Sequence, residues 1–367
     1  MRKKIFTTVF AGALALSLAG CGGSGTTGTT TAAATAAATE AAKEAEEGAE
    51  ESKADAGEAA EGEASQGEVE LKETNWEPTT TVSIVIPASA GGDTDLSARV
   101  FAQYAKEMTG HDFIVVNSSG ASGSVAANQV LASEPDGHTV LYGHNLVNVA
   151  NIAGITDYNY SAFKIGPSFV LEPAQQLYTY SDKYPDLNSF IEAAKAAPGQ
   201  LKACTEVGAY TYYELLAFQK AAGIELDLVD AGSTSDKIAA MLSGQIDLMP
   251  GPYVNCKDYL ESGQFAALGV PAEERYDVIS EIPTLKEQGI DFVYPDQEFS
   301  FYFPKDTPDE VVTWYENIVQ QILADEEALE GVANVEMMPH YLSGADTEAR
   351  EEEIYNTIKG IADELAQ

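Results

Sequence analysis

The chain has 367 residues, and its 58 acidic residues against 20 lysines and arginines give a formal net charge of −38. A chain this acidic repels nucleic acid and anionic lipid surfaces, so we expect neither to be a partner. Three cysteines are too few for a disulfide scaffold, and the length allows one large domain or two ordinary ones.

The N-terminus has the pattern of an export signal with a lipoprotein cleavage box. Three basic residues at 2–4 precede the apolar run from Ile5 to Leu18, and Ala19 and Gly20 then lead to Cys21. The alternative is an uncleaved membrane helix, but the run falls short of the roughly 20 residues that span a bilayer. We predict a signal peptide over 1–20 and diacylglyceryl attachment to the Cys21 thiol, which would anchor the protein by lipid to the membrane, outside the cytoplasm.

Residues 21–78 are low in complexity. A Gly/Ser/Thr stretch passes into a Thr/Ala and then a Glu/Ala/Gly tract that lacks the branched and aromatic residues needed for a core. Such composition predicts a disordered acidic tether. The first 20 residues carry +3 and residues 22–77 carry −11, so the remainder carries −30. The folded part therefore gives no long-range attraction to an anionic ligand.

Strands and helices alternate from residue 80 onward, with small-residue loops after the strands. Short apolar runs predict strands, and apolar residues at four-residue spacing predict helices. The first unit has a strand at 82–86, a loop at 87–95, a helix ending at Gly110, a strand at 113–116, a loop at 117–124, a helix to Ala132 and a strand at 139–142. Asp93 or Thr94 could cap the first of these helices.

The same alternation recurs downstream. It predicts helices at 185–197, 210–222 and 236–242, strands at 201–204, 226–229 and 246–249, and a long terminal helix at 308–323 that packs back on the first unit. We predict an α/β protein with two lobes, each a mostly parallel sheet flanked by helices. Lobe 1 would comprise 79–177 and 300–367, and lobe 2 would comprise 178–299. Lobe closure would occur about hinges near 177–181 and 298–301.

An anion site in this protein cannot depend on arginine. Residues 79–367 contain only Arg99, Arg275 and Arg350, and none lies in a glycine-rich loop. Backbone N–H groups at helix N-termini can bind an anion without a cationic side chain. In open α/β sheets such sites lie beyond the carboxyl ends of the strands.

Several stretches, in collinear order from about residue 80 to the C-terminus, resemble the extracytoplasmic binding proteins of the tripartite tricarboxylate transporter family, also called Bug receptors. They are Ile86–Pro87 with 90–95 and Arg99; Asn117 with 120–123; 135–139; 223–226; 244–249; 282–285; and Thr307–Pro308. The resemblance implies a two-lobed periplasmic-binding-protein (Venus flytrap) fold. Such a receptor closes on a small carboxylate, held largely by backbone amides and ordered water, and passes it to membrane permease subunits.

Three loops and two further positions are the candidate ligand-binding set. They are Ala88, Ser89, Ala90, Gly91, Thr94, Asp95, Gly120 and Asn145 in lobe 1, and Thr205, Gly208, Ala209, Tyr210, Thr211, Gly232, Ser233 and Thr234 in lobe 2. Asp95 either accepts from the ligand or stabilises its own helix as a first-turn acid. Tyr212 stands where relatives commonly have a histidine, which leaves the identity of the ligand open.

No catalytic constellation is present in the sequence. It has no G-x-G-x-x-G, no Walker lysine and no G-x-S-x-G, and its four histidines lack metal-ligand spacing. We therefore expect a monomeric binding protein, with no enzyme activity, cofactor or metal. Cys204 and Cys256 could pair or remain buried thiols. Two alternative functions stay open, a receptor for a membrane signalling partner and a surface protein without a transport role.

Overall fold

The central strand of lobe 1 is buried on both faces. The computed structural model describes residues 71–206 and 208–365. Strand β1 (Val82–Ile86) has four side chains with no exposed surface, at Val82 and 84–86, and it pairs in parallel with β2 (Phe113–Asn117) and β3 (Thr139–Gly143). The predicted strands and the loops that follow them are thus confirmed in position. The carboxyl ends of the three strands lie at one edge of the sheet.

Helices cover both faces of this sheet. Helix α1 (Asp93–Thr109) ends where Gly110 adopts a φ of +76° and donates its N–H to the Lys106 carbonyl, a conformation that glycine reaches without strain. The N-cap of α1 is Gly92, without a side-chain cap, so the predicted capping by Asp93 or Thr94 is wrong. The helical elements of lobe 1 are α1 (Asp93–Thr109), η1 (Ala121–Gly123), α2 (Ser124–Leu131), α3 (Leu146–Ile152), η2 (Tyr160–Ala162), α8 (Asp309–Leu323) and α9 (Glu326–Ala333).

The lobe 1 sheet is mixed, with the strand order β11-β4-β10-β3-β1-β2. Strand β10 (Gln297–Pro304) runs antiparallel to β3 and to β4 (Phe163–Glu172), and β11 (Met338–Pro339) is antiparallel to β4. The predicted α/β class is confirmed, but the sheet is not mostly parallel. The reason is that β4 leads the chain out of this lobe and β10 brings it back alongside.

Lobe 2 is built on smaller sheets. One has the order β8-β5-β9 with antiparallel pairs, and the parallel pair β6-β7 joins it through a bridge from Ala203 to Leu248. The predicted strand at 246–249 begins later, at Met249. The elements are β5 (Gln176–Tyr180), α4 (Leu187–Ala196), β6 (Lys202–Thr205), α5 (Tyr210–Ala222), β7 (Asp227–Asp230), α6 (Thr234–Leu242), β8 (Met249–Gly251), α7 (Tyr253–Glu261), β9 (Phe265–Gly269) and η3 (Asp277–Ile279).

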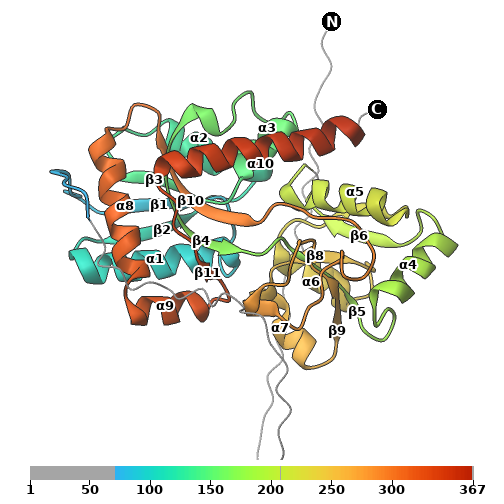
Figure 1. Ribbon diagram of the computed structural model, residues 1–367. Helices are drawn as coiled ribbons and strands as arrows, with labels where there is room; N and C mark the ends of the chain where they lie inside the picture. Colours follow the sequence, from blue (N-terminus) through green and yellow to red (C-terminus); the bar gives the residue numbers. More distant parts are fainter. Residues whose placement is uncertain (1–70, 207, 366–367) are drawn as a thin grey trace, which may run out of the picture. The chain divides into compact units, whose positions relative to one another are not determined.

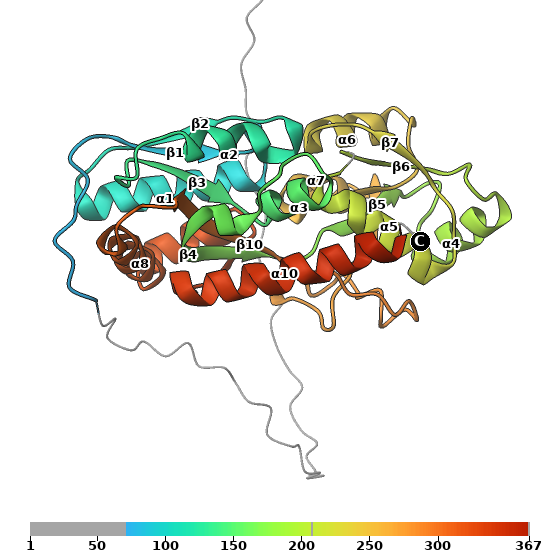
Figure 2. The same ribbon diagram turned by 90° about the horizontal axis from the view of Figure 1, so that it is seen from above.

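The chain crosses between the lobes in two short segments. One is the three residues between β4 and β5, and the other immediately precedes β10. Both lie a few residues before the predicted hinges, since Leu177 and Glu298 already belong to strands. The predicted helix at 308–323 is α8, but it is not the terminal one. Helix α10 (Gly344–Leu365) follows it and runs along both lobes, as Figures 1 and 2 show.

The end of the predicted tether belongs to the folded body. The Trp76 ring lies 5.2 Å from Trp314, edge to face, and 6.2 Å from Tyr315, stacked. The Lys72 backbone N–H and C=O both hydrogen-bond to the Asn317 side chain on α8. An aromatic side chain that reaches the core anchors its neighbours, so the tether cannot extend to residue 78 as predicted. The predicted signal peptide and Cys21 lie outside the described residues.

Candidate functional site

A cavity of about 380 Å³ lies between the loops of the two lobes. Loops after β1, β2 and β3 line it from lobe 1, and loops after β6 and β7 line it from lobe 2. Gln175 and Gln297, which flank the two crossings, and Asn255 on α7 complete the lining. The cavity therefore lies beyond the carboxyl ends of the parallel strands, where ligands bind in open α/β sheets.

Most of the predicted ligand-binding residues line this cavity. Asp95, Asn145, Thr205 and Gly208 do not. The residues that do are Ala88, Ser89, Ala90, Gly91, Thr94, Gly120, Ala209, Tyr210, Thr211, Gly232, Ser233 and Thr234.

Asp95 shapes the first loop instead of facing the cavity. Its buried carboxylate accepts from the Gly91 N–H at 2.9 Å and from Arg99 through Nε and Nη2, at 2.9 and 2.8 Å. The Asn117 side chain donates to it at 2.9 Å. Burial by itself would raise the pKa of Asp95, but these hydrogen bonds and the Arg99 charge outweigh it, and the pKa is lowered. Of the two roles proposed for Asp95, the structure favours the internal one.

Two of the other three residues outside the lining support residues within it. Thr205 Oγ1 lies 2.7 Å from Thr211 Oγ1, and Asn145 Oδ1 lies 3.0 Å from His144 Nδ1. Gly208 has a φ of +77°, and a Cβ there would lie 2.9 Å from the Ala153 Cβ of lobe 1. A side chain at 208 would therefore push the lobes apart at this point.

Charged and amide side chains that the sequence analysis missed also line the cavity. Lys237 could have been found as a cation three residues beyond a predicted loop. Gln175 and Gln297 gave no signal, because only the fold brings the two crossings together. The missed residues include Asp93, His144, Gln175, Glu206, Lys237, Asn255 and Gln297.

The backbone N–H groups at the cavity differ in whether a side chain of the protein already accepts a hydrogen bond from them. In lobe 1, Asp93 Oδ1 accepts from the Thr94 N–H at 2.7 Å, and Asp95 occupies the Gly91 N–H. Helix α6 is closed by a capping box between Ser233 and Asp236. Helix α5 has no side-chain cap and no acid in its first turn. The first N–H groups of a helix have no intrahelical acceptor, so the α5 terminus is the more open anion-binding end.

Two buried titratable side chains lie behind this terminus. Lys237 is 6% exposed, and its Nζ makes one long hydrogen bond, 3.4 Å, to Thr211 Oγ1. Burial lowers the pKa of Lys237, while nearby carboxylates including Glu214, Glu206 and Asp93 oppose the shift. Glu214 is fully buried with both carboxyl oxygens unpaired, and its burial raises its pKa well above the usual range. Burial therefore favours the protonated form of Glu214, which Lys237 partly opposes.

The lobes touch across the cavity. The Asn255 side chain donates to the Gly91 carbonyl at 3.1 Å, and the Ser122 N–H donates to Glu206 Oε1 at 3.2 Å. The rings of His144 and Tyr210 meet edge to face at 5.6 Å. Contacts of this kind would break if the lobes separated.

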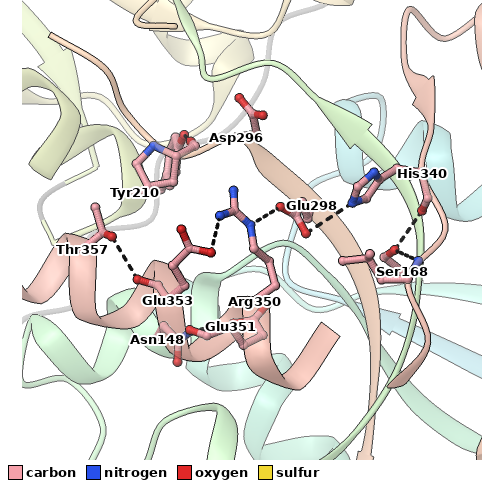
Figure 3. Close-up of polar contacts among 12 residues, drawn as sticks. Asn148, Ser168, Tyr210, Asp296, Glu298, His340, Arg350, Glu351, Glu353 and Thr357 are labelled. Atoms are coloured by element: carbon pink, nitrogen blue, oxygen red, sulfur yellow. Dashed lines mark hydrogen bonds and ion pairs between the residues drawn. The ribbon is translucent and has the colours of Figure 1, made fainter. Parts of the chain in front are cut away.

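A polar network lies where β10 approaches α10. Glu298 lies between Arg350 and His340 in Figure 3, with Arg350 Nε 2.6 Å and His340 Nε2 3.4 Å from its carboxylate oxygens. On the same helix Glu351 accepts from Asn148 and from Tyr302. These contacts fix the C-terminal helix against the strand that follows the second crossing.

In the part of the chain that the structure describes, neither a metal site nor a membrane-spanning helix is found. Within 71–206 and 208–365, no three His, Cys, Asp or Glu side chains are grouped so as to hold a metal ion. Over the same residues, no helix has the length and apolar character of a membrane span. Cys204 and Cys256 are both free and buried, which decides between the two alternatives for this pair.

Residues 97–366 match the family model described as the tripartite tricarboxylate transporter family receptor. The chain belongs to this family. The receptor is 27% identical over 271 residues to an uncharacterised-family (UPF0065) protein of Agrobacterium vitis from the ttuE-ttuC' intergenic region, covering 71% of this chain and 77% of the relative.

Solved structures agree on the fold. The receptor matches a Rhodopseudomonas palustris protein solved with adipate at a TM-score of 0.72 and 24% identity, covering 79% of this chain and 98% of that one. It matches MatC of the same organism, solved with malate, at 0.71 and 23%, covering 78% and 100%. The two-lobed periplasmic-binding-protein fold predicted from the sequence is confirmed. Family and fold are those of solute-binding receptors, which act outside the cytoplasm.

Proposed function

We propose that this receptor captures a small carboxylate in the cavity between its lobes and delivers it to a permease of the tripartite tricarboxylate type. The observation that carries the proposal is the uncapped N-terminus of α5, which opens on the cavity beside the buried Lys237. Helix amides and one sheltered cation suit a carboxylate. The family relationship and the relatives solved with malate and adipate support this ligand class.

The binding step is tested by thermal shift and titration calorimetry on the purified full chain. The panel contains acetate, succinate, malate, adipate, glutamate and citrate. A ligand that binds only the native state raises the melting temperature by mass action. We expect at least one member to do so, and Thr211→Val to weaken it. A flat response to the whole panel would refute carboxylate capture.

Delivery is tested in cells. The strain that makes the receptor should take up the radiolabelled ligand, and deletion of either the receptor or the adjacent permease subunits should abolish uptake equally. A receptor that signals to a membrane sensor would instead leave uptake unchanged and alter transcription. This comparison separates transport from the signalling alternative.

We also propose that the receptor is held at the membrane by lipid on Cys21. The basic start, apolar run and Ala-Gly-Cys box support this reading. Cys21→Ser should move the protein from the membrane fraction to the soluble fraction, and the intact mass of the wild type should include a diacylglyceryl group. A wild-type protein that is unmodified and soluble would exclude the anchor. Size-exclusion chromatography with light scattering tests the proposed monomer.

A further inference from the structure

Apart from Asp236, two acids and one lysine line the cavity. On the lobe 1 side the first loop ends in Asp93, whose carboxylate lines the cavity at the N-terminus of α1. Glu206, from the loop after β6 in lobe 2, lines it as well and accepts from the Ser122 N–H of lobe 1. The loop expected to bind an anion therefore presents a carboxylate. Its Gly91 and Thr94 N–H groups already donate to the carboxylates of Asp95 and Asp93.

The lysine comes from lobe 2. Lys237 lines the cavity, is more than nine-tenths buried and forms no ion pair with any residue in the described part of the chain. The first amides of α5, at Tyr210 and Thr211, lie beside it. Carboxylates including Glu206 and Asp93 lie near Lys237 without pairing with it directly, and a ligand carboxylate would supply a direct partner.

The remaining titratable groups at the cavity add no second cation. Burial lowers the pKa of His144, which is thus largely neutral, and burial together with Asp93 raises the pKa of Glu172 well above its usual range. Asp236 is engaged in its own capping box. Apart from Asp236, the cavity therefore presents two acids, Asp93 and Glu206, and one lysine, Lys237.

We propose that the ligand is an amino-carboxylate, with its carboxylate on Lys237 and the α5 terminus and its ammonium group on Asp93, assisted by Glu206. This rests on the proposed function and narrows its ligand class. A ligand with an anionic group at each end would set one carboxylate against Asp93, where like charges repel in a cavity of low dielectric. An ammonium group there gains a charge-assisted hydrogen bond instead.

The test compares ligands that differ only in the amine, using calorimetry on the full chain at pH 7. The pairs are succinate with aspartate, glutarate with glutamate, and pentanoate with 5-aminopentanoate. We expect the amine-bearing member of the best-bound pair to bind about tenfold tighter or more, which corresponds to about 1.4 kcal/mol.

Variants assign the two ends. Asp93→Ser should weaken the amine-bearing ligand by about tenfold and leave its partner unchanged or improved, because only the first loses a charge-assisted contact. Lys237→Met should weaken both members of the pair. Asp182→Ser is the matched control, since it removes one exposed acid outside the cavity lining, and it should change neither.

The outcomes are distinct. If carboxylates bind and the amine confers no advantage in any pair, the amino-carboxylate proposal is wrong and carboxylate capture stands. If neither carboxylates nor amino-carboxylates bind, both the carboxylate-capture proposal and the amino-carboxylate proposal are wrong. If Asp93→Ser does not fold, the affinity ratios within the ligand pairs, measured on the wild type, decide whether the ligand is an amino-carboxylate. A wild-type preference for the amine that survives in a folded Asp93→Ser protein would overturn the assignment of Asp93.

Discussion

Lys257 on α7 forms an ion pair with Glu336, which follows α9 in lobe 1, so the pair joins the lobes at a point outside the cavity lining. Lys257→Met should favour the open form and weaken the ligand by about two- to fivefold, since a partly exposed pair contributes roughly 0.5–1 kcal/mol. Calorimetry and small-angle scattering measure the two effects. Lys106→Met, which removes an exposed pair within lobe 1, is the control. A radius of gyration that ligand leaves unchanged in the wild type would count against lobe closure.

Asp95→Asn should destabilise the first loop. It removes the charge that holds Arg99 and weakens the bond to the Gly91 N–H, at a cost of about 1–2 kcal/mol after allowance for the exposure of Arg99. Urea unfolding measures this. The pKa of Asp95 is lowered in the fold, so its stabilisation is present above its ordinary pKa of 3.8 and is lost as pH falls further. The variant should lose that acid sensitivity. Equal stability of the two proteins at neutral pH would show that the network is dispensable.

Gly91 and Gly244 form a matched pair for testing the cavity. Both have positive φ, +86° and +69°, and a Cβ at either would meet no atom within 4 Å. Leucine at either position should cost a similar backbone strain, about 1 kcal/mol. Only Gly91 lines the cavity, so Gly91→Leu should abolish binding while Gly244→Leu preserves it. Normal affinity in a folded Gly91→Leu protein would place the ligand elsewhere.

Glu351 should make stability fall as pH rises. Burial raises the pKa of Glu351 to about 7, despite the hydrogen bond from Tyr302. The folded state therefore binds this proton more tightly than the unfolded state. Its contribution is complete below the unfolded pKa of 4.5 and is lost as pH rises through about 7. In Glu351→Gln the fall of the melting temperature with pH over that interval should be smaller by several degrees. A curve parallel to the wild type would exclude Glu351 as the source.

Trp76→Ala should destabilise the folded body by about 1–3 kcal/mol, because a half-buried ring that contacts Trp314, Tyr315 and His138 is lost. Chemical denaturation measures the change. Glu73→Ala, an exposed site three residues away, is the control. Removing residues 1–70 should leave stability unchanged, whereas removing 1–78 should match or exceed the loss in Trp76→Ala.

Sequence patterns predicted helices and strands well where a buried apolar segment ends at a glycine or a proline. Helix α5 begins and ends where the spacing and Gly223 predicted, and β1 is the apolar run before Pro87. Helix α10 was not predicted, since its apolar contacts to lobe 2 come mainly from Ile354 and Ile358 in an otherwise acidic segment. Strand direction also escaped prediction, because pairing between β4 and β10 joins residues more than a hundred positions apart.

The loops that line the cavity were predictable from the sequence, whereas the charged residues that line it were not. Glycines and hydroxyls in 88–94 and 232–234 marked the lining, because small residues after strands let the backbone approach a ligand. Whether an acid there faces the cavity or its own helix depends on partners such as Arg99 and Asn117, which only the fold brings to Asp95. Lys237 lies one turn inside α6, and only the fold brings its Nζ to Thr211 on α5.

The buried cysteines make the described body suitable for thiol-specific labelling. Burial raises the pKa of the Cys204 thiol to about 11 and that of Cys256 to about 12, so neither is a reactive thiolate at neutral pH. New cysteines at exposed helical positions, Gln103→Cys on α1 and Glu192→Cys on α4, would carry a donor and an acceptor dye on opposite lobes without competition from the native pair. Energy transfer between them would then follow each lobe movement in a single molecule.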